Sequence, residues 1–179
     1  MRKTIFVIAA LVVALGAAGC NKPEQKQKPV EYSGAPIPAM PSPMQIDQLQ
    51  QAAKAAPKNP QAWISLGDVL MDSRRYGEAI EAYQKGLELD PKNVNARVDM
   101  GTCYRGIGKF DKAVEEYRKA LAMDPNHPNG HRNLGVVLAY DLHDKAQGLK
   151  EFKKYLELSP NAPDAEPVRQ SIRELSGEK

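Results

Sequence analysis

A proline recurs in this sequence at a nearly constant interval. The prolines are Pro57, Pro91, Pro125 and Pro160, so the steps between them are 34, 34 and 35 residues. Each one follows a segment whose apolar residues have helical spacing. Proline has no amide hydrogen to donate to a helix, and it disfavours helical backbone in the residue before it. Each proline therefore predicts the end of a helix, and the interval predicts a chain of repeated units.

The residues between these prolines resemble the tetratricopeptide repeat, a helix-turn-helix unit of 34 residues. Small, apolar and aromatic residues fill the family's characteristic positions in each of three successive units. They are Trp63, Leu66, Gly67, Ala79, Tyr83 and Pro91, then Arg97 in place of Trp, Met100, Gly101, Tyr104, Ala113, Tyr117, Ala120 and Pro125, then His131, Leu134, Gly135, Leu138, Phe152 and Pro160. The third unit fits when one extra residue is allowed between Ala139 and Gln147.

The resemblance implies an all-α fold, a superhelix of stacked helix-turn-helix units over residues 44–176. The expected full repeats are residues 60–93, 94–127 and 128–162. A half repeat precedes them, and a capping helix over residues 164–176 follows. Three full units are enough for a stable stack, since each unit buries its apolar face against its neighbours. Glycines inside the helices are expected to allow close helix approach.

The first residues predict an export signal. Arg2 and Lys3 precede an apolar run of 14 residues, which is short for a membrane span and typical of a signal peptide. The stretch LGAAGCN resembles the end of a bacterial lipoprotein signal. That resemblance implies removal of residues 1–19 and attachment of lipid, including palmitate, to Cys20. An ordinary signal peptide cut near Ala18 is the alternative.

Residues 20–43 are expected to form a tether. Six prolines and almost no large apolar residue lie between Asn21 and Pro43, so this stretch cannot build a core. Proline-rich chain is extended and holds a domain away from its anchor. Together with the lipid this implies a domain on the periplasmic side of the cell envelope. The resemblance to lipoproteins also implies the outer membrane, since Asn21 follows the cysteine where lipoproteins retained in the inner membrane have aspartate.

The sequence offers few groups for chemistry. The formal net charge is +3 without a block of like charges, so no nucleic-acid partner is expected. His127 and His131 are separated by Pro128 and have no third ligand nearby, so no metal site is expected. Cys103 is expected to be a small buried side chain, with an intermolecular disulfide as the alternative. With no haem-attachment motif or phosphate loop, we expect no enzyme, no cofactor and no small-molecule substrate.

The expected functional surface is the concave face, where members of the family hold an extended or helical partner segment. The resemblance places the first helices of the units there. Besides Gln61, Asn95 and Asn129, the candidate binding residues are Ile64, Asp68, Met71, Asp72, Val98, Thr102, Arg105, Arg132, Val136 and Tyr140. We interpret the apolar members as positions that the hairpin cores do not need. The aspartates of the first unit and the arginines of the other two predict a groove with one acidic end and one basic end. A clamp for a terminal carboxylate, as in chaperone-binding members of the family, is not expected.

These patterns favour a non-catalytic scaffold whose partner is a protein or peptide segment, with a lipid anchor as its link to the membrane. The stretch YLELSPNAPDAEPVRQSIREL resembles tetratricopeptide subunits of c-type cytochrome maturation systems. That resemblance implies help in assembling cytochrome c or another envelope complex. Pilot lipoproteins of secretins and outer-membrane assembly lipoproteins are two other kinds of relative. The alternative function is a structural lipoprotein that associates with itself or with cell-wall proteins.

Overall fold

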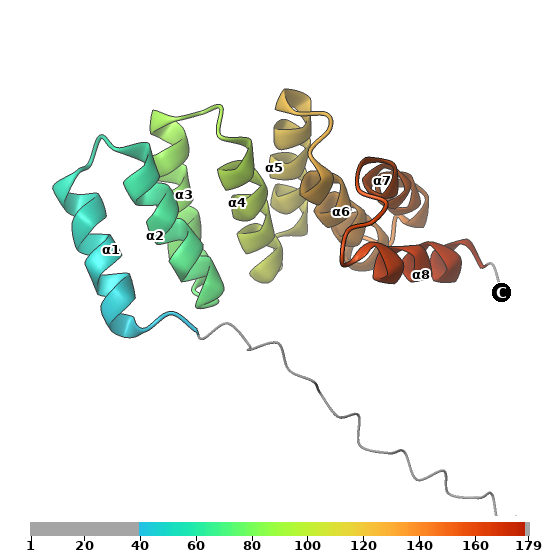
Figure 1. Ribbon diagram of the computed structural model, residues 1–179, viewed down its shortest axis with the longest axis horizontal. Helices are drawn as coiled ribbons and strands as arrows, with labels where there is room; N and C mark the ends of the chain where they lie inside the picture. The colour runs from blue at the N-terminus through green and yellow to red at the C-terminus, as the bar shows by residue number, and fades with distance from the viewer. Residues whose placement is uncertain (1–39, 178–179) are drawn as a thin grey trace, which may run out of the picture. The chain divides into compact units, whose positions relative to one another are not determined.

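The computed structural model describes residues 40–177, and over this range the chain is helical (Figure 1). Short turns join eight α-helices, and a π-helical segment, η1, continues α6. Their bounds are α1 Pro43–Ala55, α2 Pro60–Asp72, α3 Tyr76–Leu89, α4 Val94–Gly106, α5 Phe110–Met123, α6 Pro128–Val136, η1 Val137–Asp141, α7 Lys145–Leu158 and α8 Ala165–Ser176. The predicted all-α class is confirmed. None of the helices within this range is long and apolar enough to cross a membrane.

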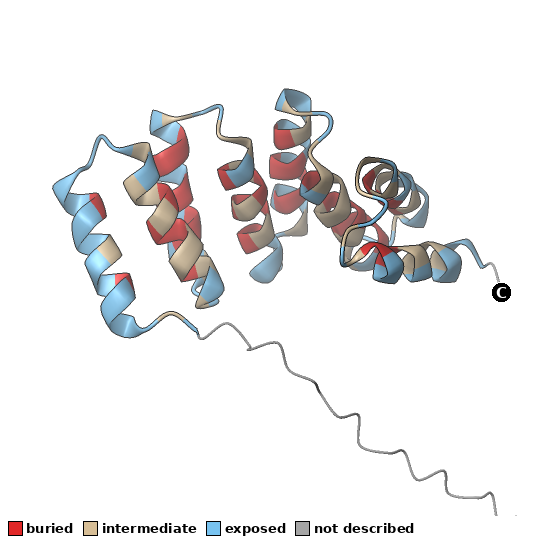
Figure 2. Cartoon of the chain, in the orientation of Figure 1, coloured by how far each residue is buried: buried red, intermediate tan, exposed pale blue. Residues whose placement is uncertain are grey.

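The helices form three successive hairpins, α2 with α3, α4 with α5, and α6 with α7. The second helix of each hairpin packs on the first helix of the next, α1 packs on α2, and α8 packs on α7 (Figure 1). The first helices α2, α4 and α6 also contact one another in succession, so they share one face of the stack. Buried residues concentrate where neighbouring helices meet (Figure 2).

Polar side chains and prolines define the helix ends. The side chains of Asn59, Asn93 and His127 each accept a hydrogen bond from a backbone amide in the first turn of α2, α4 and α6, as helix N-caps do. The repeating prolines each follow within two residues of a helix end, after α1, α3, α5 and α7. The helix ends that the prolines predict are therefore confirmed.

One repeated contact explains how arginine and histidine can replace tryptophan. Trp63 Nε1 donates to the carbonyl oxygen of Pro57 at 3.1 Å, and an Arg97 guanidinium nitrogen donates to that of Pro91 at 3.2 Å. His131 Nε2 lies 2.9 Å from the carbonyl oxygen of Pro125. The position thus requires an N–H group that reaches back to the preceding proline, whichever side chain carries it.

Each hairpin closes over a glycine that faces an aromatic ring. A Cβ on Gly67 would lie 2.7 Å from the Tyr83 ring, and a Cβ on Gly101 would lie 2.7 Å from the Tyr117 ring. In the third hairpin Gly135 faces Phe152 in the same way, at 2.8 Å. Close helix approach at these glycines is confirmed.

The extra residue of the third unit is accommodated by η1. A π-helical turn takes one residue more than an α-helical turn, so α6 is lengthened without a break. Gly148 of α7 packs directly on this turn, since a Cβ there would lie 2.5 Å from the Ala139 Cβ. The third hairpin therefore places a glycine where the other two have Ala79 and Ala113, both fully buried.

Candidate partner-binding hollow

A hollow of about 700 Å³ lies on the face that α2, α4 and α6 share. Polar side chains dominate its lining, and all of them come from these three helices or their N-caps. The lining residues are Gln61, Ile64, Asp68, Met71, Asn93, Asn95, Ala96, Val98, Asp99, Thr102, His127, Asn129, Arg132 and Asn133. We refer to this site as the hollow.

The structure brings six of the ten candidate binding residues together around the hollow: Ile64, Asp68, Met71, Val98, Thr102 and Arg132. The other four lie outside its lining. Asp72 and Arg105 are at the C-terminal ends of α2 and α4. Val136 packs into the core beside Phe152, and Tyr140 of η1 is 41% exposed with its ring 6.3 Å from that of Phe152.

The interpretation of the apolar members as surplus to the cores is wrong for Ile64, Met71, Val98 and Val136, although Tyr140 is exposed. Ile64 is 7% exposed and Val98 is 2% exposed, and Met71 packs against the same core. For Ile64 the cause is the close approach of α3 at Gly86, where a Cβ would lie 2.7 Å from the Ile64 side chain. Ile64 and Val98 form the buried base of the hollow, Met71 is half-buried beside them, and the exposed groups around them are mainly polar.

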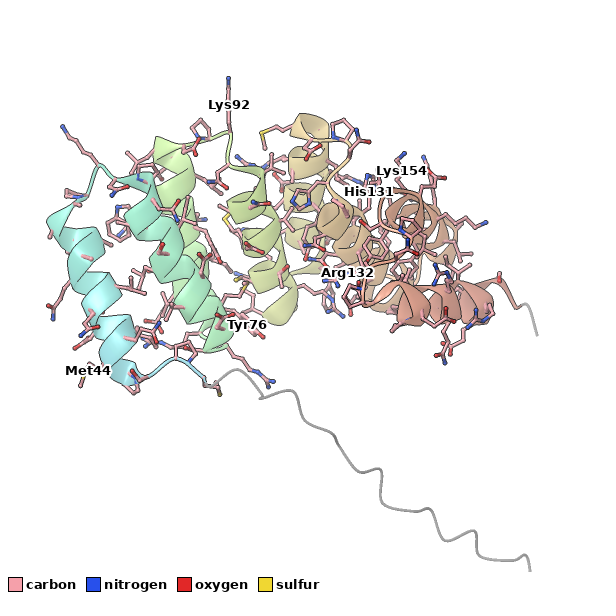
Figure 3. The ribbon with its side chains drawn as sticks, viewed as in Figure 1. Met44, Tyr76, Lys92, His131, Arg132 and Lys154 are labelled. Atoms are coloured by element: carbon pink, nitrogen blue, oxygen red, sulfur yellow. The ribbon has the colours of Figure 1, made fainter. Side chains whose placement is uncertain are left out.

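The expectation of a basic end is also wrong. Arg105 Nε lies 2.5 Å from the Asp141 carboxylate. Arg132 forms an ion pair with Asp164 at the start of α8, and Asp164 also accepts a hydrogen bond from the Tyr155 hydroxyl. Figure 3 shows the Arg132 side chain where α6 meets α8. Arg105 therefore links the second unit to the third, Arg132 links the third unit to the capping helix α8, and the charge of both guanidinium groups is neutralised within the chain.

The charge that remains in and beside the hollow is acidic, and sequence analysis missed one of its members. Burial raises the pKa of Asp99 to about 6, and repulsion from Asp68 and Asp72 adds to the effect. Burial likewise raises the pKa of Asp68, against the hydrogen bond that its carboxylate accepts from the Tyr83 hydroxyl at 2.8 Å. Asp99 follows Asn95 by one helical turn, and that i, i+4 spacing is the signal that could have identified it.

The aromatic residue of each second helix is matched by the residue that faces it from the first helix. Where the second helix carries tyrosine, the first helix carries a polar partner: Asp68 for Tyr83, and Thr102 for Tyr117 at 3.1 Å. In the third unit the aromatic residue is Phe152, and the corresponding first-helix residue, Val136, is apolar. Buried hydroxyl groups need hydrogen-bond partners. A tyrosine on the second helix therefore requires a polar residue at the facing position of the first helix, and a phenylalanine does not.

Within the described residues neither a metal site nor an accessible thiol is found. Within residues 40–177 no group of three or more His, Cys, Asp or Glu side chains is arranged to hold a metal ion. The predicted burial of Cys103 is confirmed, since this thiol is fully buried. Its burial, together with the charges of Asp99 and Asp68, raises its pKa to about 12. A protonated, inaccessible sulfur is a poor nucleophile and is not exposed for disulfide formation.

Comparisons with known proteins identify related folds. Residues 70–136 match a family model described as tetratricopeptide repeat. The small glutamine-rich tetratricopeptide repeat-containing protein 2 of Mycosarcoma maydis is 54% identical over 41 residues, which are 23% of this chain and 12% of that protein. This chain therefore spans only a small part of that relative.

Solved structures are similar over longer ranges. A crystal structure of MamA has a TM-score of 0.67 at 22% identity, covering 74% of this chain and 77% of that one. The first TPR domain of Spaghetti (RPAP3), bound to the HSP90 peptide SRMEEVD, has a TM-score of 0.61 at 23% identity, covering 66% and 91%. The Arabidopsis OM64 TPR domain has a TM-score of 0.60 at 16% identity, covering 64% and 94%.

Proposed function

Since the folded part of this chain is a stack of tetratricopeptide repeats, we propose that it is a non-catalytic scaffold that holds a partner segment in the hollow. One observation carries the proposal. Asp68, Asp72 and Asp99 lie in or beside the hollow, and within residues 40–177 none of them forms an ion pair. Clustered carboxylates that repel one another favour a partner that brings positive charge.

The partner segment therefore carries lysine or arginine where it crosses α2 and α4. This chemistry differs from that of the RPAP3 domain, whose bound peptide SRMEEVD contains three acidic residues and one arginine. An acidic segment would meet Asp68, Asp72 and Asp99 here, while both nearby arginines are already paired with Asp141 and Asp164. Complementary charge accelerates encounter and rejects partners of the wrong sign.

The proposal includes the membrane anchor predicted at Cys20, which lies outside the described residues, as do residues 1–19 and most of the tether. Intact-mass measurement of the membrane-bound protein should show loss of residues 1–19 and a gain of acyl chains, because stable anchoring needs at least two lipid signals. Cys20→Ser should release the protein from membranes. A mature protein that begins elsewhere, or one that salt washes off the membrane, would contradict this part.

If the protein is anchored at the outer membrane, the function we favour is help in assembling a membrane complex or a cytochrome. A segment of an apocytochrome c is one candidate partner, on the strength of the C-terminal resemblance. The alternative is a structural role in which a second copy or a cell-wall protein occupies the hollow. Native mass of the purified protein distinguishes self-association from a hetero-complex.

Co-purification from detergent-solubilised membranes tests the proposal. The double variant Asp68→Asn with Asp99→Asn removes two charges from the hollow, and the new amide oxygen at position 68 can still accept a hydrogen bond from Tyr83. We expect recovery of the partner to fall by roughly fivefold or more, equivalent to about 1 kcal/mol. The matched control is Asp111→Asn with Glu115→Gln on the exposed side of α5. If the control loses the partner while the hollow variant retains it, the proposed surface is wrong.

A further inference from the structure

We infer that the hollow recognises the backbone of an extended partner segment through a row of carboxamides, Gln61, Asn95 and Asn129. This inference rests on the proposed function and adds how the segment is held. The three residues occupy the same position in three successive first helices, 34 residues apart. All three are exposed, and all three line the hollow. We call them the amide row.

The orientation of Asn95 is set by a helix cap. The Gly130 backbone amide donates to His127 Nδ1 at 3.0 Å, so Nδ1 is the acceptor nitrogen and the ring hydrogen lies on Nε2. His127 Nε2 is 2.8 Å from Asn95 Oδ1 and therefore donates to it. This occupies one lone pair of the Asn95 oxygen, and within residues 40–177 both hydrogens of its NH2 group are without a side-chain acceptor. Asn95 consequently presents a donor to the hollow.

Gln61 is oriented in the opposite sense. Its Nε2 donates one hydrogen to Ser65 Oγ at 3.2 Å along the same helix, which leaves its oxygen with both lone pairs free to accept. Asn129 makes no side-chain hydrogen bond within the described residues and can supply either role. The amide row thus offers an acceptor on α2, a donor on α4 and a group of either kind on α6.

These groups complement a peptide backbone, since every peptide unit carries one N–H donor and one C=O acceptor. An extended segment presents such groups along its edges. A helical segment has already used them in its own hydrogen bonds. The amide row therefore selects extended, unfolded segments over helical ones.

The amide row and the acidic residues have different tasks. Backbone groups are common to all sequences, so the amide row accepts segments of varied sequence. Asp68, Asp72 and Asp99 then favour those with a basic side chain. A scaffold built this way suits an unfolded client during assembly better than one folded partner of fixed shape.

Fluorescence anisotropy with synthetic peptides tests this inference on the purified chain. The probe is a labelled, end-blocked 12-residue peptide of alanine and serine with two lysines. Its matched forms have alternate backbone amides N-methylated, in one register or the other, with the same side chains. N-methylation in the register that faces the amide row removes the peptide N–H groups whose hydrogen bonds the Gln61 and Asn129 side-chain oxygens would accept. It should weaken binding roughly tenfold, as the loss of two hydrogen bonds does.

The variant Gln61→Ala with Asn129→Ala, which removes both acceptors, should bind the unmethylated peptide roughly tenfold more weakly and lose the discrimination between the two registers. The control variant Gln48→Ala with Asn126→Ala removes two exposed carboxamides outside the hollow and should bind as the original chain does. Equal binding of methylated and unmethylated peptides by the original chain would overturn the backbone inference and leave the proposed function standing. Failure of the original chain to bind any of these peptides would count against the proposed function itself.

Discussion

Gly148 should not tolerate even a methyl group, because α7 lies directly against η1 at this point. A Cβ on Gly148 would lie 2.5 Å from the Ala139 Cβ and 2.9 Å from the Ala139 Cα and N atoms. Backbone atoms cannot rotate away as a side-chain tip can, and Ala139 is only 3% exposed. Overpacking costs about 1–3 kcal/mol, while replacing a helical glycine by alanine contributes about 0.5–1 kcal/mol in its favour. We expect Gly148→Ala to lower the free energy of unfolding by about 1–2 kcal/mol.

Gly77 provides the matched control for this substitution. It lies near the start of α3, and no atom is within 4 Å of the position that its Cβ would take. Gly77→Ala should leave stability unchanged or raise it by up to about 1 kcal/mol. Thermal unfolding followed by circular dichroism should place Gly148→Ala roughly 2–8 °C below the original chain, at about 2–4 °C per kcal/mol. A Gly148→Ala variant that melts at or above the original temperature would refute the close contact between α7 and η1.

The remaining predictions concern the hairpin joints and the acidic residues. Ala79→Leu or Ala113→Leu, at two fully buried positions, should each lower the free energy of unfolding in urea by roughly 1–3 kcal/mol; an unchanged midpoint in both would refute the assigned register. Because the pKa of Asp99 is about 6 in the folded chain, above that of an aspartate in an unfolded chain, its contribution to stability should fall by roughly 1–3 kcal/mol as the pH rises from about 4 to about 7. Thermal melts across this range should therefore show the melting temperature of Asp99→Asn rising relative to that of the original chain as the pH rises. The control Asp47→Asn, at an exposed position on α1, should show no such relative rise. A difference for Asp99→Asn that stays constant with pH would contradict the raised pKa.

The hairpins could be predicted because their determinants are local. A proline that ends a helix, an N-cap and a glycine opposite an aromatic ring each act within one unit, and the 34-residue interval repeats them. The extra residue of the third unit could be located only to within a few residues, since η1 overlaps the start of the expected range, Ala139 to Gln147. Its form as a π-helical turn could not, since that depends on how α7 packs against Ala139.

The hollow was less predictable because its character depends on contacts between units. Helical spacing places Ile64 on the same face of α2 as the polar residue Asp68, yet the approach of α3 at Gly86 buries the Ile64 side chain. The charges of Arg105 and Arg132 are neutralised by Asp141 and Asp164, which lie 36 and 32 residues further along the chain. No local pattern reports such pairs.

Photo-crosslinking in the cell tests the central claim most directly. A benzophenone amino acid is placed at Asn129 in the hollow or, as a control, at Glu115 on the exposed side of α5, and each adduct is mapped by mass spectrometry. We predict an adduct from position 129 to a partner segment with lysine or arginine within a few residues of the linked atom, and none of that segment from position 115. An adduct to the partner from position 115 alone, or to an acidic segment from position 129, would contradict it.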